Sequence, residues 1–465
     1  MLYNDARNLK KGVLRILQEI KLFKLKFRQK FNKTPRQGLT MRQMRLFFGK
    51  LLSLKQGEFK LLALSFGFIF VLFSSYALLR PMRDALGLAG GKDELKWLFL
   101  GTFIACIFAS IVLMWLSTRV KRRFYIDFVL IFFGLNLLIF YGSMKGIAPE
   151  SSEFVWLCRI FYVWVSVFNL FAFSSAWSLL SDIFSKEASQ RLFGIIAAGA
   201  SLGSIAGAAS VKFLVAHIGV SNLIFASMLL LGFALMLKYA MIAELKHFET
   251  AESLARFDKT IGAKNPFVGF LLIIKSRYLL MLCAFVLLLT SVSTFLYMEQ
   301  ARIIRDLFPT REARVAAFAN IDLIVQSLAL FIQIFLTAKI AQFFRLTTML
   351  GALGFVIGFG FIVLAFTHPA FLPIVIVMSI RRVGEYALVK PAREMLFVPL
   401  SSDEKYKVKN FLDAVVYRGG DALSAQVEGI FANIGIVAVL LVGAGISFVW
   451  GILGILLGRA YHKEK

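Results

Sequence analysis

Residues 61–80 read LLALSFGFIFVLFSSYALLR, a stretch in which the closing Arg80 is the only charged side chain. An α-helix of this length crosses the roughly 30 Å hydrocarbon core of a bilayer. Similar runs recur as far as Ile455, and each is continuously apolar rather than alternating. Lipid offers the backbone no hydrogen bonds, so a spanning segment must be a helix or belong to a closed barrel, whose strands would alternate. The pattern therefore predicts an all-α polytopic membrane protein.

The apolar runs form two halves of six spans, which gives about twelve transmembrane helices. The longest interruption, at 243–277, is polar and charged and is expected to be a cytoplasmic linker. We expect the following organisation: a basic segment at 1–58, six-helix halves at 59–242 and 278–458, and a tail at 459–465. The predicted spans are 61–80, 97–116, 124–142, 155–181, 192–215, 221–242, 278–298, 316–337, 346–367, 371–396, 411–431 and 434–457.

The net charge of +26 is unevenly distributed along the chain. Much of the excess precedes the first span or lies in short loops, as the positive-inside rule expects of cytoplasmic segments. This distribution argues against a nucleic-acid partner and predicts that both termini lie in the cytoplasm. Four arginines on the predicted outer side break the rule: Arg302, Arg305, Arg311 and Arg314. Either the seventh span extends into a vestibule there, or these arginines contact substrate.

The N-terminal segment carries apolar residues at helical spacing among lysines, from Val13 to Phe23. One interpretation is an amphipathic helix that lies on anionic lipids. The alternative, a disordered basic tail, stays open. The sequence has three cysteines and four histidines, all scattered, so we expect no disulfide framework, no metal site and no cofactor.

An internal repeat links the ends of spans one and ten. Residues 76–84 read YALLRPMRD and residues 386–394 read YALVKPARE. Five positions are identical, and two more exchange Arg for Lys or Asp for Glu. Internal repeats of this kind are a hallmark of secondary transporters. Each copy contains a proline, which removes a backbone hydrogen bond, so we expect both helix ends to be broken or kinked.

Charged residues inside spans are costly and normally face protein or a water-filled pathway. The functional interpretation is a cavity that binds an anion, because arginine offers a planar fork to phosphate or carboxylate oxygens. The structural alternative is a set of salt bridges, such as Arg83 with Asp84 or Arg381 with Glu385. The candidate substrate-binding residues are Arg80, Arg83, Glu299, Arg302, Arg381, Arg382, Lys390 and Arg393. The candidate gating or coupling residues are Asp84, Glu385, Glu394, Asp413, Arg418 and Asp421.

Three further spans carry polar or small residues. In span five Gly199, Gly203 and Gly207 are spaced by four, which predicts close helix packing. Span eleven places several polar residues on one face, either as a seam between helices or as a gate. Spans four and eight are cavity candidates, with polar helix contacts as the alternative, through Asn169, Trp177, Asp182, Asn320, Asp322, Gln326 and Gln333.

The chain contains no phosphate-binding loop of the G-x-x-x-x-G-K-[ST] type and no nucleophile elbow. We therefore expect a transporter driven by gradients or exchange rather than an enzyme. The stretch 386–421 resembles the bacterial and plastid ATP:ADP antiporters, a nucleotide transporter family. The shared pattern begins with a proline, a basic residue and Glu-Met. A Pro-Leu pair, a loop with Lys-x-Lys and an aspartate in the next helix follow. The stretches LLRPMRD at 78–84 and FLYMEQAR at 295–302 are similar to that family's first and seventh helices.

The resemblance implies a major facilitator-like fold and places the family's functional residues at Arg83, Arg393 and Glu299. The family's fourth-helix glutamate has no counterpart, because Val165 and Ser166 stand there. The resemblance implies an exchanger of nucleotides, ATP against ADP, in a bacterial inner membrane. We expect a monomer whose substrate is a nucleotide or another anionic solute. Two alternatives remain: a proton-coupled transporter or exporter in which Glu299, Glu385 or Asp421 titrates, and a membrane scaffold that does not transport.

The predicted topology gives the two basic motifs a specific arrangement. Span one runs outward and span ten inward, so Arg80 and Arg83 should lie near the outer mouth of a pathway. Lys390 and Arg393 should lie near the inner mouth. Without substrate, the acids next to each motif should pair with its arginines, and substrate should compete with those pairs. On this basis Arg83→Ala and Arg393→Ala should each abolish transport.

Overall fold

The computed structural model describes residues 58–91, 94–245, 255–260, 268–335, 345–397, 408–409 and 411–464. The predicted amphipathic helix lies outside these residues, as do 246–254 and 261–267 of the predicted linker. The described residues from Lys60 onward belong to one compact unit, which contains the cavities and contacts below.

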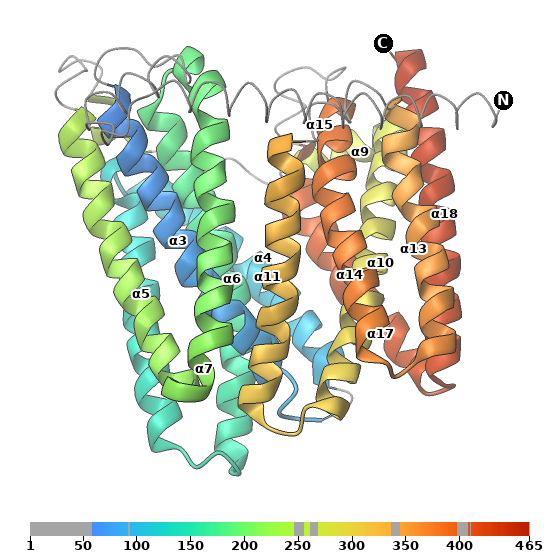
Figure 1. Ribbon diagram of the computed structural model, residues 1–465. Helices are drawn as coiled ribbons and strands as arrows, with labels where there is room; N and C mark the ends of the chain where they lie inside the picture. Colours follow the sequence, from blue (N-terminus) through green and yellow to red (C-terminus); the bar gives the residue numbers. More distant parts are fainter. Residues whose placement is uncertain are drawn as a thin grey trace, which may run out of the picture. The chain divides into compact units, whose positions relative to one another are not determined.

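The described residues are nearly all helical (Figure 1). The first half consists of α3 (Glu58–Leu86), α4 (Glu94–Arg119), α5 (Arg122–Gly146), α6 (Ser152–Ile183) and α7 (Lys186–Leu245). Two short helices follow, η1 (Ala255–Asp258) and α9 (Val268–Lys275). The second half consists of α10 (Arg277–Leu307), α11 (Arg311–Phe335), α13 (Leu346–Thr367), α14 (Phe371–Gly384), η2 (Glu385–Val389), α15 (Lys390–Leu396), η3 (Leu412–Val416), α17 (Tyr417–Ala432) and α18 (Ile436–Glu464).

Nine helices among the described residues are long and apolar enough to cross a bilayer. One of them, α7, is two helices joined at Gly219, whose φ of 76° only glycine adopts readily. Two further spans are each assembled from consecutive segments: α14, η2 and α15 form one, and η3 with α17 forms the other. The described residues thus contain the twelve spans that the hydropathy pattern predicts.

The prolines of the repeated motif affect their helices differently. The α3 helix continues through Pro81, so it is not broken there. Before Pro391 the chain forms the π-helical segment η2, and the Lys390 backbone N–H donates to the carbonyl of Glu385. A π turn is wider than an α turn, which gives space to a proline ring that would otherwise meet the preceding turn. The predicted distortion is confirmed there.

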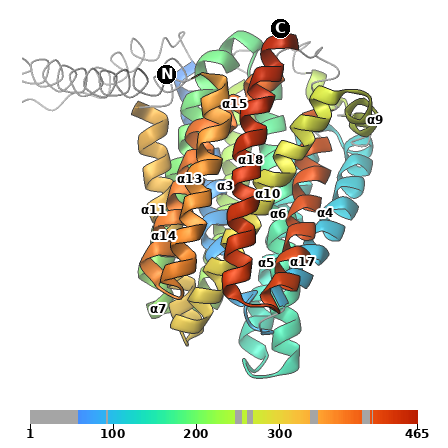
Figure 2. The same ribbon diagram turned by 90° about the vertical axis from the view of Figure 1, so that its right-hand side faces the viewer.

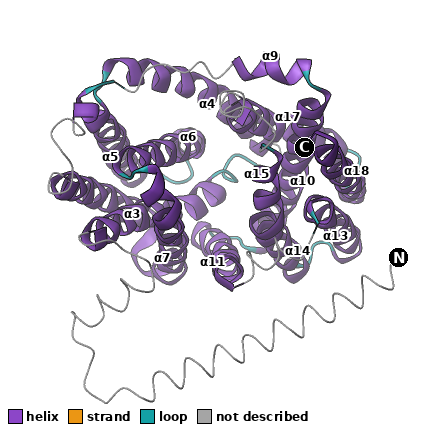
Figure 3. Cartoon of the chain, turned by 90° about the horizontal axis from the view of Figure 1, so that it is seen from above, coloured by secondary structure: helices purple, strands orange, loops and turns teal. Residues whose placement is uncertain are grey.

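The two halves meet along two pairs of helices. The α4 helix packs on α17, and α7 packs on α11 (Figures 2 and 3). We call the end of the bundle where α3 begins and α18 ends the terminal side, and the opposite end the far side (Figure 1). The α3 helix runs from the terminal side to the far side, and the span from α14 to α15 runs the other way. Which side faces the cytoplasm stays a prediction.

The glycines of span five allow α7 to lie directly against α3. A Cβ atom added at Gly203 would stand 2.2 Å from the carbonyl oxygen of Phe70, and one at Gly207 would stand 2.6 Å from that of Ser74. The Ser74 hydroxyl also donates to the Gly203 carbonyl at 3.0 Å. The predicted packing role of these glycines is confirmed.

Gly203→Ala should lower the thermal stability of the purified protein, because its methyl group would push two backbones apart, at a cost of about 1–3 kcal/mol. Gly134→Ala is the matched control. That glycine is also inside a helix, but a Cβ there would meet nothing within 4 Å. Alanine is the better helix former, so the control should be neutral or stabilising. Equal melting temperatures for the two variants would contradict this packing role.

Candidate substrate-binding cavity

A cavity of about 680 Å³ lies between the two halves. Side chains from α3, α4, α6 and α7 line it on one side, and side chains from α10, α11, α14, η2, α15 and α17 on the other. The volume is in the range of small-molecule sites.

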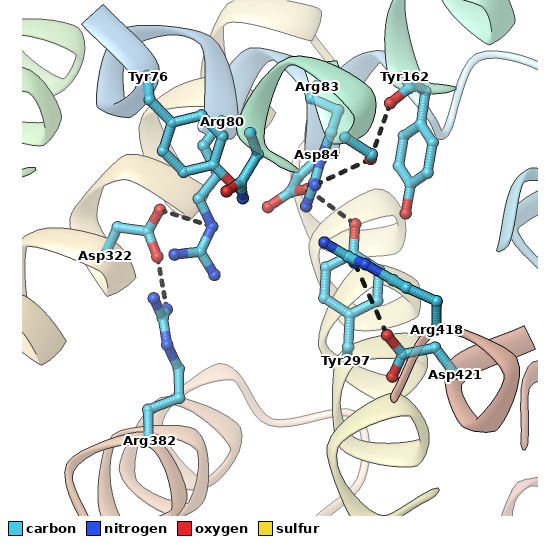
Figure 4. Close-up of polar contacts among 12 residues, drawn as sticks. Tyr76, Arg80, Arg83, Asp84, Tyr162, Tyr297, Asp322, Arg382, Arg418 and Asp421 are labelled. Carbon is cyan, nitrogen blue, oxygen red and sulfur yellow. Dashed lines mark hydrogen bonds and ion pairs between the residues drawn. The ribbon is translucent and has the colours of Figure 1, made fainter. Parts of the chain in front are cut away.

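Asp322 lines this cavity and joins three helices (Figure 4). Its Oδ1 accepts a hydrogen bond from Arg382 Nη1 of α14 at 2.5 Å, and its Oδ2 lies 3.6 Å from Arg80 Nε of α3. Arg382 and Asp322 are both buried. Because Arg80 belongs to the first half and the other two to the second, this carboxylate links the halves across the cavity.

Arg83 lies one turn further along α3 and is held by its neighbour in sequence. Its Nε and Nη2 donate to Asp84 Oδ1 at 2.9 and 2.6 Å. The same carboxylate oxygen accepts the Tyr297 hydroxyl of α10 at 2.9 Å. The Tyr162 ring centroid lies 5.1 Å from the Arg83 guanidinium carbon, a cation–π distance (Figure 4). The predicted salt bridge between Arg83 and Asp84 is therefore present.

Two more ion pairs lie in the second half. Arg381 Nη1 donates to Glu385 Oε2 at 3.0 Å, one helical turn further on, and also to the Ser293 hydroxyl. Arg418 Nη1 lies 3.9 Å from Asp421 Oδ2, and Thr294 donates to the other oxygen of Asp421 at 3.1 Å.

Positive charge exceeds negative charge around the cavity. Six cationic side chains line it, namely Arg80, Arg83, Arg381, Arg382, Lys390 and Arg418. Four carboxylates pair with them: Asp84, Asp322, Glu385 and Asp421. Lys390 lies over the Tyr386 ring at 4.2 Å and has no carboxylate partner among the described residues. A low-dielectric cleft with a net charge of one sign attracts small ions of the opposite sign.

Aromatic rings form much of the remaining wall. Phe73 and Phe173 stack with their centroids 4.0 Å apart, and the Tyr76 hydroxyl accepts a hydrogen bond from Asn169. The aromatic residues that line the cavity are Phe73, Tyr76, Phe99, Phe103, Tyr162, Phe173, Trp177, Tyr297, Tyr386 and Tyr417.

Several contacts hold the halves together on the far side. Tyr297 reaches Asp84, and Gln426 Nε2 donates to the Lys96 carbonyl at 3.0 Å. The Arg311 guanidinium lies over the Phe154 ring at 5.3 Å. From these contacts the cavity extends toward the terminal side, where Trp177 and Lys390 line it. These contacts close the cavity on the far side.

The comparison with family profiles agrees with this architecture. The profile described as Major Facilitator Superfamily matches residues 60–387. The chain belongs to the major facilitator superfamily. It is a multi-pass membrane transporter rather than an enzyme. A comparison with curated proteins gave no significant match.

Solved structures of other transporters share the fold of this major facilitator protein. The peptide transporter POT in complex with sulfate is similar with a TM-score of 0.63 and 14% identity, over 87% of this chain and 95% of that one. A mutant of the nucleoside transporter NupG gives 0.57 and 11%, over 87% and 99% of the two chains. The inward-open xylose transporter XylE from E. coli gives 0.57 and 10%, over 87% and 95%. At such identities these likenesses establish the fold alone.

The predicted site residues of this major facilitator protein fall into three groups. The structure brings together at the cavity Arg80, Arg83, Arg381, Arg382, Lys390, Arg418 and Asp421, with Asp84 and Glu385 behind them. The other five predicted residues lie outside the cavity lining, on the far side or on the terminal side.

On the far side, Glu299 and Arg302 belong to a separate buried network. Arg302 donates to Glu299 Oε2 and to Glu428 Oε1, both at 2.5 Å. His368 Nδ1 lies 2.6 Å from the other oxygen of Glu299. The side chains of both glutamates are 0% exposed. Expecting Glu299 and Arg302 in the cavity wall was wrong, because the rotation of α10 turns them toward α17 and the end of α13.

On the terminal side, Arg393, Glu394 and Asp413 form ion pairs outside the cavity lining. Arg393 Nη1 lies 3.3 Å from Asp413 Oδ1, and Lys409 Nζ donates to both oxygens of Glu394 at 2.8 Å. The expected pairing of Glu394 with Arg393 is therefore wrong. The repeated motif keeps its tyrosine and first cation in the cavity in both copies, but its second arginine only in the first copy.

The polar residues noted in spans four and eight divide in the same way. Asn169, Trp177, Asp322 and Gln326 line the cavity, whereas Asp182 pairs with Arg122 at 3.0 Å. The side chain of Gln333 lies outside the described residues. Sequence reasoning missed Tyr162 and Tyr297, because a tyrosine inside an apolar span has no pattern that separates a cavity wall from ordinary packing.

Proposed function

We propose that this transporter carries an organic anion with two or more negative charges and a flat apolar part. The six cations against four carboxylates support this proposal most directly. An anion with two negative charges would neutralise the excess of two positive charges around the cavity. The aromatic walls would contact the flat part of the substrate.

Unsatisfied donors support the same substrate class. Arg381 Nε and Arg382 Nη2 are buried and have no hydrogen-bond partner among the described residues. Buried donors are costly when unpaired, so their presence favours a ligand with oxygen acceptors. Carboxylate and phosphate oxygens match the arginine fork and form charge-assisted hydrogen bonds.

The Asp322 link suggests how binding couples to alternating access. A substrate anion that binds Arg80 and Arg382 competes with Asp322 for both guanidinium groups. When Arg80 binds substrate in place of Asp322, the ion pair that links the first half to the second is broken. A ligand shifts a conformational equilibrium by its differential affinity for the two states, and this exchange of partners provides such a difference.

A nucleotide is our first candidate, transported by exchange, because it joins phosphates to a flat base. Uptake of labelled ATP and other nucleotides into proteoliposomes tests this. We expect uptake that internal ADP accelerates and that collapse of the proton gradient leaves unchanged. If no nucleotide is transported but a dicarboxylate or another organophosphate is, the result supports an anionic substrate and contradicts the assignment of a nucleotide. Transport of neutral or cationic solutes alone would contradict both.

The runner-up is proton-coupled transport, which the Glu299–Arg302–Glu428–His368 network favours. Two carboxylates share one arginine there, so protonation of one acid would leave a neutral group beside an ion pair. In the uptake experiment this mechanism predicts accumulation that stops when the proton gradient is collapsed, whatever solute is inside. Glu299→Gln would then uncouple transport from the gradient.

A further inference from the structure

A second hollow lies on the membrane-facing side of the first half. It has a volume of about 980 Å³ and is separate from the central cavity. The α4 and α5 helices each pack closely on α6 but only slightly on each other (Figure 3). Residues of all three helices line the hollow, which we call the groove. Trp97, Phe132, Trp156 and Ile160 line it, and each is more than half exposed. In a membrane-spanning bundle these surfaces face lipid.

The end of the groove on the far side is polar. Arg159 Nε donates to Glu94 Oε1, and the guanidinium carbon lies 4.4 Å from the Trp156 ring centroid. Arg159 makes no other hydrogen bond among the described residues, so its two Nη groups are available to a ligand. Glu94 is 8% exposed, and its Oε2 is buried without a hydrogen-bond partner among those residues.

A second unsatisfied group lies deeper in the groove. Trp164 Nε1 is buried and has no hydrogen-bond partner among the described residues. Trp164 follows Arg159 by five residues on α6, which places it roughly 7–8 Å further from the far side. The lining further toward the bilayer centre is apolar, through Phe132, Phe133 and Val167. The groove therefore changes from cationic to hydrogen-bonding to apolar with depth.

We propose that this groove binds one phospholipid. Its phosphate contacts Arg159, an ester carbonyl accepts the hydrogen bond of Trp164 Nε1, and an acyl chain lies along Phe132 and Val167. The order of these three groups along a phospholipid is the order of their partners along the groove. Trp97 and Trp156 lie at the polar end, as expected of tryptophans at a membrane interface.

Tryptophan fluorescence gives a direct measurement, because three of the six tryptophans line the groove: Trp97, Trp156 and Trp164. Delipidated protein in detergent would be titrated with phosphatidylglycerol brominated on one acyl chain, and native mass spectrometry would count the retained lipids. We expect saturable quenching with one lipid retained. Diacylglycerol with the same brominated chains should bind at least about tenfold more weakly, because it lacks the phosphate.

The decisive variant is the double substitution Glu94→Gln/Arg159→Gln, which removes the cation without leaving a buried charge unpaired. It should weaken phosphatidylglycerol binding at least about tenfold and remove the preference over diacylglycerol. Lys145→Gln is the matched control. Lys145 is an exposed cation on the same side, 4.5 Å from the Tyr141 ring centroid, but outside the groove. The affinity of the Lys145→Gln protein for phosphatidylglycerol should stay within about twofold of that of the unaltered protein.

Two results would overturn the proposal. One is quenching that is equal for the unaltered protein, the double variant and Lys145→Gln, which would indicate nonspecific coating of the apolar surface. The other is equal affinity of the unaltered protein for diacylglycerol and phosphatidylglycerol. That result would contradict a contact between the lipid phosphate and Arg159. Melting temperatures of the variants, measured in parallel, show whether each protein is folded during the titration.

Discussion

Arg382→Ala is expected to reduce the initial rate of transport roughly a hundredfold. Its guanidinium lies 2.5 Å from Asp322 inside the cavity, and one of its terminal nitrogens has no partner among the described residues. Removing it deletes a contact to the substrate anion and leaves Asp322 with Arg80 at 3.6 Å. Loss of one member of a buried charge pair at a binding surface commonly costs about 2–5 kcal/mol, and each 1.4 kcal/mol is a factor of ten. The measurement is uptake by proteoliposomes of the anion that a substrate panel selects.

Two further variants make this prediction specific. Arg382→Lys should keep part of the activity, because a point charge remains while the planar fork is lost. Arg393→Ala is the matched control and should stay within about twofold, because Arg393 is a mostly buried arginine of the same motif that lies outside the cavity lining and pairs with Asp413. This replaces the sequence-based expectation that Arg393→Ala abolishes transport. Equal losses for Arg382→Ala and Arg393→Ala would contradict the assignment of the site to the central cavity.

Lys238→Met should lower the free energy of unfolding by about 3–5 kcal/mol, because it leaves a buried carboxylate without its cation. Lys238 is 1% exposed, and its Nζ lies 2.8 Å from Asp127 Oδ1 and 2.9 Å from Oδ2. The Tyr239 hydroxyl donates to the same carboxylate at 2.8 Å. The pair joins α5 to the second part of α7. Unfolding of the purified protein in mixed micelles, followed by circular dichroism, measures the change.

The double variant Lys238→Met/Asp127→Leu distinguishes a charge effect from a packing effect. Replacing both members of a buried ion pair with apolar residues of similar volume is often neutral, so most of the lost stability should return. A double variant as unstable as the single one would show that packing, rather than the unpaired carboxylate, determines the result. A single variant as stable as the unaltered protein would contradict the buried pair itself.

The number and placement of the spans followed from the sequence because hydropathy is a local property. Residues 346–367 and 371–396 were predicted with the same bounds that the structure gives. An apolar run of this length must satisfy its backbone hydrogen bonds internally in lipid, whatever packs around it. The repeat at 76–84 and 386–394 indicated which cations to examine, since a charge inside a span needs a polar environment.

The choice among those cations was decided by tertiary structure. Arg83 and Arg393 occupy the same place in the repeated motif, yet only Arg83 lines the cavity. Whether a side chain on a helix reaches a cavity depends on the rotation of that helix and on its neighbours, which a motif does not encode. The same reason explains Glu299, which carries the charge expected of a cavity residue but pairs with Arg302 and His368 on the far side.

The sequence by itself determined that this protein is a helical membrane protein of two similar halves with arginines within its spans. Only the tertiary structure decided that Asp322 links Arg80 to Arg382, that ten aromatic residues line one cavity, and that Arg159 and Trp164 share a groove facing the lipid. Each of these contacts joins residues from different helices or exposes one face of a helix. Their distances depend on how helices pack side by side, and local sequence patterns do not carry that information.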